Sequence, residues 1–359
     1  DKLIWPRPKT SYWLSGKIYR SEMNLSALKL PLSWLATIRL GFAGLFLKMT
    51  PWWKRLERVT AQNWLRRWMG DEVYNTLWRP LLIGKFGDRF DKVNMAWMWA
   101  RIKARSVKLG TCEGGFQAFL DALADAVRRK GVEIRLGSFV TSICEGSGGL
   151  QLTANGEQHL FDFVISSSSP RQLLSQVPAI GETPYGDAVK NLDSIGAICV
   201  VIALDQSLLT DGTYWLNLPA SGADKSGNQF PFLALVEHTN WMDKRHYGGD
   251  TLVYCGDYAD PNHEYFSMTD DALVERFTAA LPLVNPAFDR NWIRKSWVWR
   301  AQYAQPVPGL DHSRAIPDLK TPIAGLFWAS MSQVYPWDRG TNYAIEIGRR
   351  VARRVLDEA

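Results

Sequence analysis

The residues near the C-terminal end of the chain carry its clearest chemical pattern. Residues 325–356 read GLFWASMSQVYPWDRGTNYAIEIGRRVARRVL, which predicts a short apolar strand at 326–329, a polar loop, and a long helix that begins near Gly340. The first turn of a helix leaves backbone N–H groups without partners and carries the positive end of the helix dipole. The strand, loop and helix therefore predict a site for an anionic or electron-rich group of a cofactor.

A second candidate for chemistry is His238, in the run Glu237-His238-Thr239-Asn240 that follows a predicted strand. The titration range of histidine suits proton transfer, so His238 is the candidate catalytic residue. The alternative is a histidine that ends a strand and hydrogen-bonds to backbone. Both interpretations stay open.

Several familiar motifs are absent from the sequence. It contains no GxGxxG, no GxSxG and no phosphate-binding P-loop. The four cysteines form no CxxC pair and the five histidines show no HExxH spacing, so we expect neither a zinc site nor a disulfide framework. This cysteine usage predicts a reducing compartment, the cytoplasm.

Composition adds a hypothesis about a surface. The chain has 359 residues, enough for two domains, and 17 tryptophans. Between Arg39 and Lys108 there are 15 Lys or Arg against 5 Asp or Glu, in a stretch that is also rich in tryptophan. Such a region suits peripheral contact with an anionic membrane at its inner face, or amphipathic helices whose tryptophans face the core. The apolar stretch 34–49 is too short to span a bilayer, and we expect no nucleic-acid partner.

The elements that position these residues follow from periodicity and turn residues. Helices are predicted at 33–48, 60–69 and 71–77, with Pro80, Gly84 and Gly87 ending this block. The middle of the chain predicts a helix at 116–129 and strands at 132–136, 139–144 and 163–166, with a hairpin at 150–161. A strand-rich region follows, with strands predicted at 195–204, 214–218, 232–236, 251–258 and 291–301 and one helix at 270–283.

Three segments together carry a resemblance to a known family. They are Glu113-Gly114-Gly115-Phe116 with the helix and strands to residue 143, the strand and proline turn at 163–170, and the C-terminal segment 325–351. In this order they resemble the flavin-containing amine oxidases and protoporphyrinogen-oxidase-like proteins. The resemblance implies an FAD/NAD(P)-binding Rossmann-like domain of α/β type, FAD as the cofactor, and an oxidoreductase.

The resemblance also implies roles for individual residues. The backbone of Val140 would meet the adenine end of FAD, and the loop from Ser330 onward would run beside the ribityl chain and flavin ring. Gly340 would admit close approach of the ring, and the amides of Thr341 and Asn342 would face its pyrimidine edge. An ordinary polar helix start and a core valine are the alternatives. Asp338 and Arg339 are either an exposed turn pair, or Arg339 orients the loop or meets an anionic group.

Two departures from the family pattern qualify this resemblance. Relatives often carry Gly-Asp or Gly-Glu after the C-terminal strand, with the acid on the ribityl chain, whereas this sequence has Ser330-Met331. The glycine-rich βαβ unit that opens such proteins is missing from the sequence. The FAD domain is therefore expected to be discontinuous and N-terminally incomplete, and the chain is expected to bind FAD weakly or not at all.

The resulting prediction is a two-domain flavoprotein. The FAD domain uses 106–185 and 318–359, while the substrate domain uses a helical part at 1–105 and a mixed sheet at 186–317. The predicted activity is oxidation of an organic, hydrophobic small molecule by hydride transfer to FAD. The alternatives are a non-redox flavoenzyme of the sugar-nucleotide mutase type and a membrane-associated, non-catalytic fragment.

Overall fold

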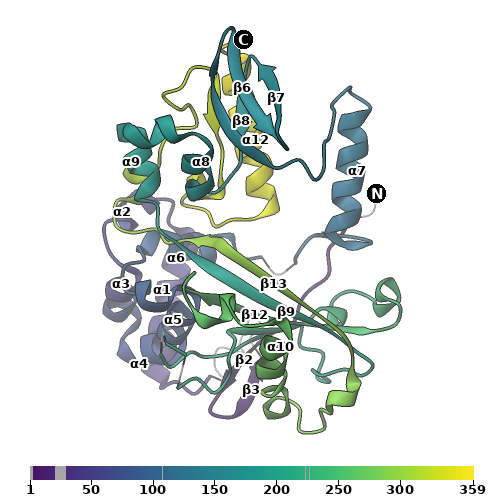
Figure 1. Cartoon of the computed structure of the whole chain (residues 1–359). Helices are drawn as coiled ribbons and strands as arrows, with labels where there is room; N and C mark the ends of the chain where they lie inside the picture. The colour runs from purple at the N-terminus through teal and green to yellow at the C-terminus, as the bar shows by residue number, and fades with distance from the viewer. Residues whose placement is uncertain (1–2, 21–29, 107, 223, 226) are drawn as a thin grey trace.

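A computed structural model of the chain describes residues 3–20, 30–106, 108–222, 224–225 and 227–359. Figure 1 shows a large mixed sheet with helices beside it in the lower part of the molecule, and a smaller group of helices and strands above. This mixed α/β architecture confirms the predicted fold class.

The large sheet has seven strands in the order β13-β9-β12-β11-β10-β2-β3. Buried side chains alternate along β12, as expected for a strand with one face on a core. All neighbouring pairs are antiparallel except β10 with β2, which joins residues near the start of the chain to the middle of the sequence. The strands are β2 (Thr10–Leu14), β3 (Lys17–Arg20), β9 (Ser194–Leu204), β10 (Trp215–Asn217), β11 (Ala234–Glu237), β12 (Thr251–Ala259) and β13 (Ile293–Pro306).

The early helices form one side of this lower part (Figure 1). Thr60 caps α3, as its spacing to Asn63 predicts, because its side chain accepts a hydrogen bond from the Asn63 N–H. Pro80 and Gly84 do not end the block, which corrects the prediction. Pro80 occupies the first turn of α5, where a missing N–H is harmless, and Gly84 packs closely against Leu233. The helices are α1 (Trp34–Met49), α2 (Trp53–Leu56), α3 (Ala61–Met69), α4 (Asp71–Val73), the π-helical turn η2 (Tyr74–Trp78), α5 (Arg79–Phe86) and α6 (Met95–Ala104).

The upper part joins two distant pieces of the sequence. Strand β8 (Val164–Ser166) pairs in parallel with β14 (Leu326–Trp328), and α12 (Thr341–Leu356) packs beside them through Ile347 and Val351. An antiparallel sheet of β5 (Val140–Gly146), β6 (Gly149–Ala154) and β7 (Glu157–Phe161) lies next to this pair, with helices α8 (Pro170–Gln176) and α9 (Pro184–Lys190). The bounds of the two proposed domains stay a prediction.

Helix α7 (Gly115–Arg128) stands apart from this upper group in Figure 1. None of its residues is buried, and its apolar side chains Phe116, Leu120 and Leu123 are exposed. The predicted strand at 132–136 is wrong. A strand needs a neighbour to satisfy its backbone hydrogen bonds, and no strand of the described residues pairs with this segment.

The remaining elements complete the chain. The predicted helix at 270–283 is shorter than expected, because α10 (Asp270–Thr278) gives way to a separate 3₁₀ turn at Leu281–Leu283 that contains Pro282. Two short strands, β1 (Leu3–Ile4) and β4 (Thr111–Cys112), pair with each other, and α11 (His312–Ala315) precedes β14. Among the described helices, none is long and apolar enough to cross a bilayer.

Candidate functional site

The start of α12 offers backbone donors without a side-chain cap. Gly340 is the N-cap residue and provides no side-chain cap, and the first turn contains no acidic residue. Gly340, Thr341 and Asn342 are exposed. The backbone of Gly340 is extended, a conformation that any residue can adopt. Glycine matters here because it leaves room: a Cβ at this position would lie 3.0 Å from Asn342 Oδ1. These donors and the helix dipole could serve an anionic or electron-rich ligand, and binding of a cofactor here stays a prediction.

The loop before α12 is anchored at Tyr335. The Tyr335 hydroxyl accepts a hydrogen bond from Asn94 Nδ2 at 2.9 Å, and the ring packs edge-on against Trp53 and His312. Burial lowers the pKa of His312 to about 4, with Glu57 opposing the shift. These contacts fix the loop to the helical side of the molecule.

Ser330 and Met331 lie at the start of the same loop. The Ser330 N–H donates to Gln333 Oε1 at 2.8 Å, and its hydroxyl accepts from the Ser332 N–H at 3.2 Å. Ser330 is buried and Met331 is half-buried. The polar groups of Ser330 thus stabilise the turn itself, and its predicted contact with the ribityl chain stays a prediction.

Asp338 and Arg339 are not an exposed turn pair. Asp338 forms a close ion pair with Arg101. Arg339 donates hydrogen bonds to Gln305 Oε1 and to the Tyr258 hydroxyl. Burial alone would raise the pKa of Asp338, but Lys85, Arg101 and Arg339 together lower it below the usual value. The pair therefore connects the loop to α6, β12 and β13.

Lys85 joins this group and was not predicted from the sequence. Its Nζ lies 4.7 Å from the ring centre of Tyr258 and 5.5 Å from that of Trp97, and the residue is 9% exposed. The available signal was a lysine within an apolar helical run, Leu-Leu-Ile-Gly-Lys-Phe at 81–86. A buried lysine is rare unless it has a partner, which makes the position informative.

Val140 begins β5 and is half-buried in the upper part. Its carbonyl accepts a hydrogen bond from Gln176 Nε2 at 2.8 Å, so this acceptor already has a partner. The proposed contact of Val140 with adenine stays a prediction.

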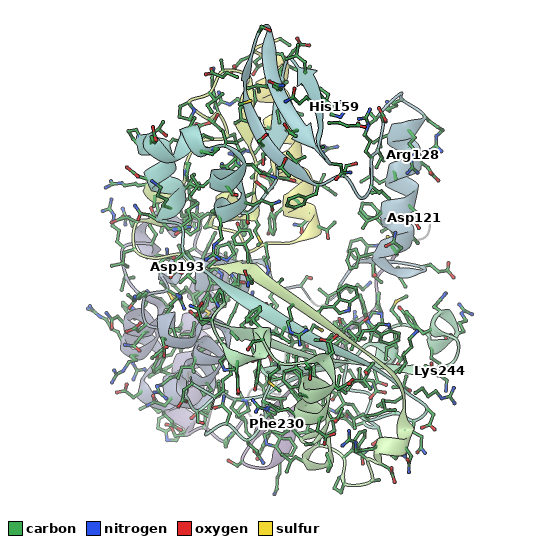
Figure 2. All side chains as sticks on the ribbon, in the orientation of Figure 1. Asp121, Arg128, His159, Asp193, Phe230 and Lys244 are labelled. Atoms are coloured by element: carbon green, nitrogen blue, oxygen red, sulfur yellow. The ribbon has the colours of Figure 1, made fainter. Side chains whose placement is uncertain are left out.

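His238 lies away from the residues around α12. Its Nε2 is 2.7 Å from the Tyr247 hydroxyl, and the rings of Trp241 and Tyr254 surround it. Burial lowers the pKa of His238. Tyr254 and Tyr258 are four residues apart on β12, a span of about 13 Å. Lys244, six residues after His238, lies across the molecule from Asp193, which directly precedes β9 (Figure 2). A catalytic role for His238 stays a prediction.

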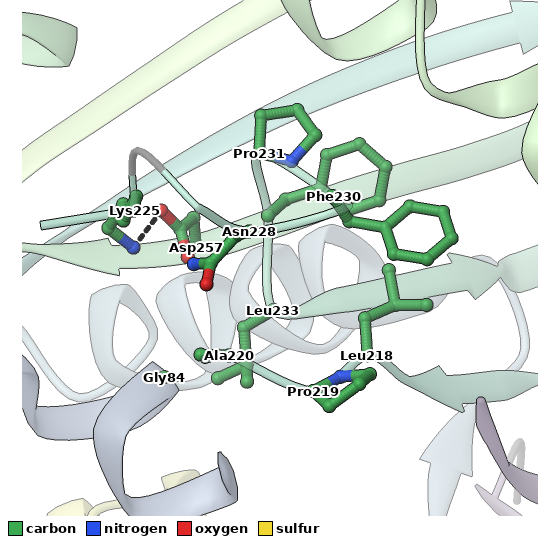
Figure 3. Close-up of a pocket in the computed structure, with 11 residues that line it drawn as sticks. Gly84, Leu218, Pro219, Ala220, Lys225, Asn228, Phe230, Pro231, Leu233 and Asp257 are labelled. Carbon is green, nitrogen blue, oxygen red and sulfur yellow. Dashed lines mark hydrogen bonds and ion pairs between the residues drawn. The ribbon is translucent and has the colours of Figure 1, made fainter. Parts of the chain in front are cut away.

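A second buried ion pair lies in the sheet region. Lys225 Nζ is 2.5 Å from Asp257 Oδ2, and burial raises the pKa of Asp257 to about 6 despite the attraction of Lys225. Figure 3 shows this pair at the edge of a small cavity lined also by Gly84, Phe230 and Leu233. The free space of about 10 Å³ suits one water molecule, so this cavity is too small for a substrate.

A larger hollow of about 570 Å³ opens between α12 and the segment 313–319. Tyr335 and Gln333 line it, together with Arg350, Arg353 and Arg354 of α12. Among the described residues, no group of three His, Cys, Asp or Glu side chains is placed to hold a metal ion.

Comparison with known proteins decides the family. The sequence profile of the family described as "Flavin containing amine oxidoreductase" matches residues 11–356. The chain belongs to this flavin-containing amine oxidoreductase family. Membership confirms the resemblance found in the sequence, and the family is one of FAD-dependent oxidoreductases.

The individual proteins that resemble this chain have low sequence identity to it. Coproporphyrinogen III oxidase from Staphylococcus aureus is 24% identical, over 46% of this chain and 42% of that protein. The chain thus spans less than half the length of this relative in the match. A candidate protoporphyrinogen oxidase from Exiguobacterium sp. 255-15 superposes with a TM-score of 0.73 at 15% identity, over 99% of this chain and 82% of the other.

A further solved structure, reduced UDP-galactopyranose mutase, gives a TM-score of 0.73 at 13% identity, over 100% of this chain and 80% of the other. Identities this low show the shared fold alone. The mutase likeness therefore carries no weight for the reaction.

Proposed function

We propose that this protein oxidises an organic small molecule, with FAD bound at the start of α12. Bound FAD supplies the hydride acceptor for such a reaction. The observation that carries the proposal is the uncapped N-terminus of α12, which begins at Gly340 in a chain of the flavin-containing amine oxidoreductase family.

The residues present fit one end of the cofactor. The amides of Thr341 and Asn342 would hold the pyrimidine edge of the flavin, and the helix dipole would favour negative charge there. The loop anchored by Tyr335 and Asn94 would keep Gly340 in place beneath the ring. The sequence lacks a glycine-rich loop for the pyrophosphate, so we expect weak binding of FAD by the 359-residue chain.

Titration of the purified chain with FAD tests this proposal, with flavin fluorescence as the readout. Gly340→Val should weaken binding at least tenfold, because the new side chain would crowd the place where the family resemblance puts the ring. Gly348→Val is the matched control in the same helix, where an added Cβ meets nothing within 4 Å. Equal affinities for the two variants would contradict the site, and tight stoichiometric binding by the wild-type chain would contradict the expected weakness.

The reaction class needs a separate measurement. A fusion that supplies a glycine-rich βαβ unit ahead of the chain should bind FAD, and a substrate should then bleach the oxidised flavin under anaerobic conditions. Turnover that occurs only after prior reduction, with no net electron transfer, would instead identify the mutase-type alternative. A fusion without flavin would favour a non-catalytic module.

We also propose that α1 brings the protein to an anionic membrane, where a hydrophobic substrate would partition. Apolar side chains on α1 lie exposed in a stripe, while Ala36, Ala43 and Leu47 face the core. Exposed Lys54 and Arg55 lie in α2, the next helix along the chain. The exposed stripe comprises Trp34 at 75%, Ile38 at 44%, Phe42 at 73%, Leu45 at 57% and Met49 at 71%.

This arrangement is that of a helix lying in a membrane interface, with apolar groups inserted and cations near the headgroups. Co-sedimentation with phosphatidylserine-containing vesicles should be lost in Phe42→Asp and kept in Leu310→Asp, which alters an exposed apolar residue outside the stripe. Binding that is equal in both variants would refute the role of α1. Light scattering without vesicles would detect the alternative, in which the same stripe joins two copies of the chain.

A further inference from the structure

Three cations converge beside the loop that leads into α12. Lys85 of α5, Arg101 of α6 and Arg339 of the loop are called the cationic cluster below. The Trp97 ring contacts both Lys85 and Arg101, at 5.5 Å and 5.0 Å from its centre. The Tyr258 ring likewise contacts Lys85 and Arg339, at 4.7 Å and 5.5 Å. The cations therefore surround two adjacent aromatic rings.

The negative charge around the cationic cluster does not balance it. Asp338 is the one carboxylate of the described residues that forms ion pairs with these cations, through Arg101 and Arg339. No acceptor among the described residues takes a hydrogen bond from Lys85. Burial, reinforced by Arg101, lowers the pKa of Lys85 well below its usual value. Asp338 opposes this shift without cancelling it, so a charge on Lys85 is only partly compensated, which destabilises a folded protein.

An independent observation marks the same place. Trp97 is 4% exposed, and its Nε1 donor is buried without any hydrogen-bond partner. Buried polar groups normally have a partner, so an orphaned donor calls for a ligand or water. Lys85 and Arg101 both contact the ring that carries this donor, so the unsatisfied donor lies within the same group of side chains.

Two members of the cationic cluster are partly exposed to solvent. The side chain of Arg101 is 43% exposed and that of Arg339 is 28% exposed, whereas Lys85 lies deeper. A small ion entering past Arg101 would meet donors from α5, α6 and the loop. Guanidinium and ammonium groups together suit the oxygen atoms of a carboxylate or a phosphate.

We propose that the cationic cluster is a binding site for an oxyanion, a carboxylate or a phosphate group. The ion would bridge Lys85 and Arg101, and it would supply the acceptor that Lys85 and the cluster lack. If the proposed function also holds, on which this step rests, the oxyanion is an acidic group of the substrate. The substrate would then be an organic acid or a phosphate ester held next to the start of α12.

Thermal unfolding with inorganic phosphate tests the site without any flavin, so a failure of FAD binding leaves the result unaffected. Potassium chloride at matched ionic strength controls for screening. The wild-type chain should show a rise in Tm that follows the logarithm of phosphate concentration above Kd, about 2 °C at ten times Kd. Acetate should compete if the site also accepts a carboxylate.

Variants separate binding from a structural role. Lys85→Met should abolish the phosphate response while leaving Tm without phosphate equal or higher, because it removes a buried charge that is only partly compensated. Lys92→Met, an exposed lysine in the same helical region, should keep the full response. Should Lys85→Met fail to fold, Arg101→Gln at the more exposed position should lose the response instead.

The opposite results are equally clear. Identical responses to phosphate and chloride in the wild type would overturn the site, as would an undiminished phosphate response in Lys85→Met and Arg101→Gln. A fall in Tm in Lys85→Met combined with no phosphate response in the wild type would assign the cluster to stability alone.

Discussion

Acid is expected to destabilise this fold through one buried histidine, His312. The residue is 7% exposed and packs against Tyr335, the anchor of the loop before α12, with 5.0 Å between ring centres. Burial lowers its pKa from 6.5 to about 4, an effect that Glu57 partly opposes. The folded protein therefore holds His312 neutral where the unfolded chain would protonate it.

The sign and size of the effect follow from linkage. Between pH 6.5 and pH 4 the unfolded chain binds more protons at this position than the folded protein, so stability falls as the pH falls. The full difference corresponds to about 3 kcal/mol, of which about 2 kcal/mol is already lost at pH 5. Below pH 4 this group contributes no further change.

Urea unfolding at pH 7 and pH 5 measures this contribution. His312→Phe removes the titrating group and keeps a planar ring, so its loss of stability between the two pH values should be about 2 kcal/mol smaller than that of the wild type. Phe327→Leu, a buried change without a titrating group, should lower stability by the same amount at both pH values.

A wild type and a His312→Phe variant with parallel pH dependence would refute this reasoning. That result would mean that His312 is hydrated or paired when protonated, and that the low exposure of the ring does not govern its titration.

Three further predictions concern stability and reactivity. Glu237→Leu should lower the free energy of unfolding by roughly 2–4 kcal/mol, because the Leu208 and Leu209 amides would lose their acceptor, with a smaller loss for Glu237→Gln; urea titration measures both. Trp328→Ala should cost about 3–5 kcal/mol by the same assay, since the ring is fully buried between the upper elements. Iodoacetamide should alkylate exposed Cys144 first, and buried Cys255, whose pKa is raised by burial, only after unfolding, as peptide mass mapping would show.

Local patterns predicted most of the strands and helices. The apolar residues of 195–204 and 251–258 match β9 and β12, and the helix starting near Gly340 matches α12. Such elements can be predicted because the burial of one face produces a regular spacing of apolar residues, and because a capping residue stands next to the helix that it starts. The cap of α3 is an example, because the spacing of Thr60 and Asn63 in the sequence predicted the hydrogen bond between them.

Tertiary context overruled local preference elsewhere. The β-branched residues at 132–136 form no strand because the structure describes no partner for them, and Pro80 fits inside α5 because the first turn needs no N–H from it. The preference of a residue for helix or strand does not reveal whether a partner strand will be present, or which turn of a helix a proline will occupy.

The cationic cluster was beyond sequence reasoning for a related reason. Arg101 and Asp338 are 237 residues apart, and no spacing connects them. Prediction from the sequence did select Asp338 and Arg339 through the family resemblance, but not Lys85 or Tyr258. Only the fold brings α5, α6, β12 and the loop to one place.

The parallel pairing of β8 with β14 has a consequence during synthesis. Trp328 Nε1 donates to the carbonyl of Ser168, 160 residues earlier, so β8 leaves the ribosome long before its partner is made. At ordinary translation speeds that interval is roughly 10–30 s, during which the strand edge and its apolar neighbours stay uncovered. The upper part therefore cannot complete this pairing until the ribosome has made β14, and a chaperone that binds unpaired strands would have that interval in which to act.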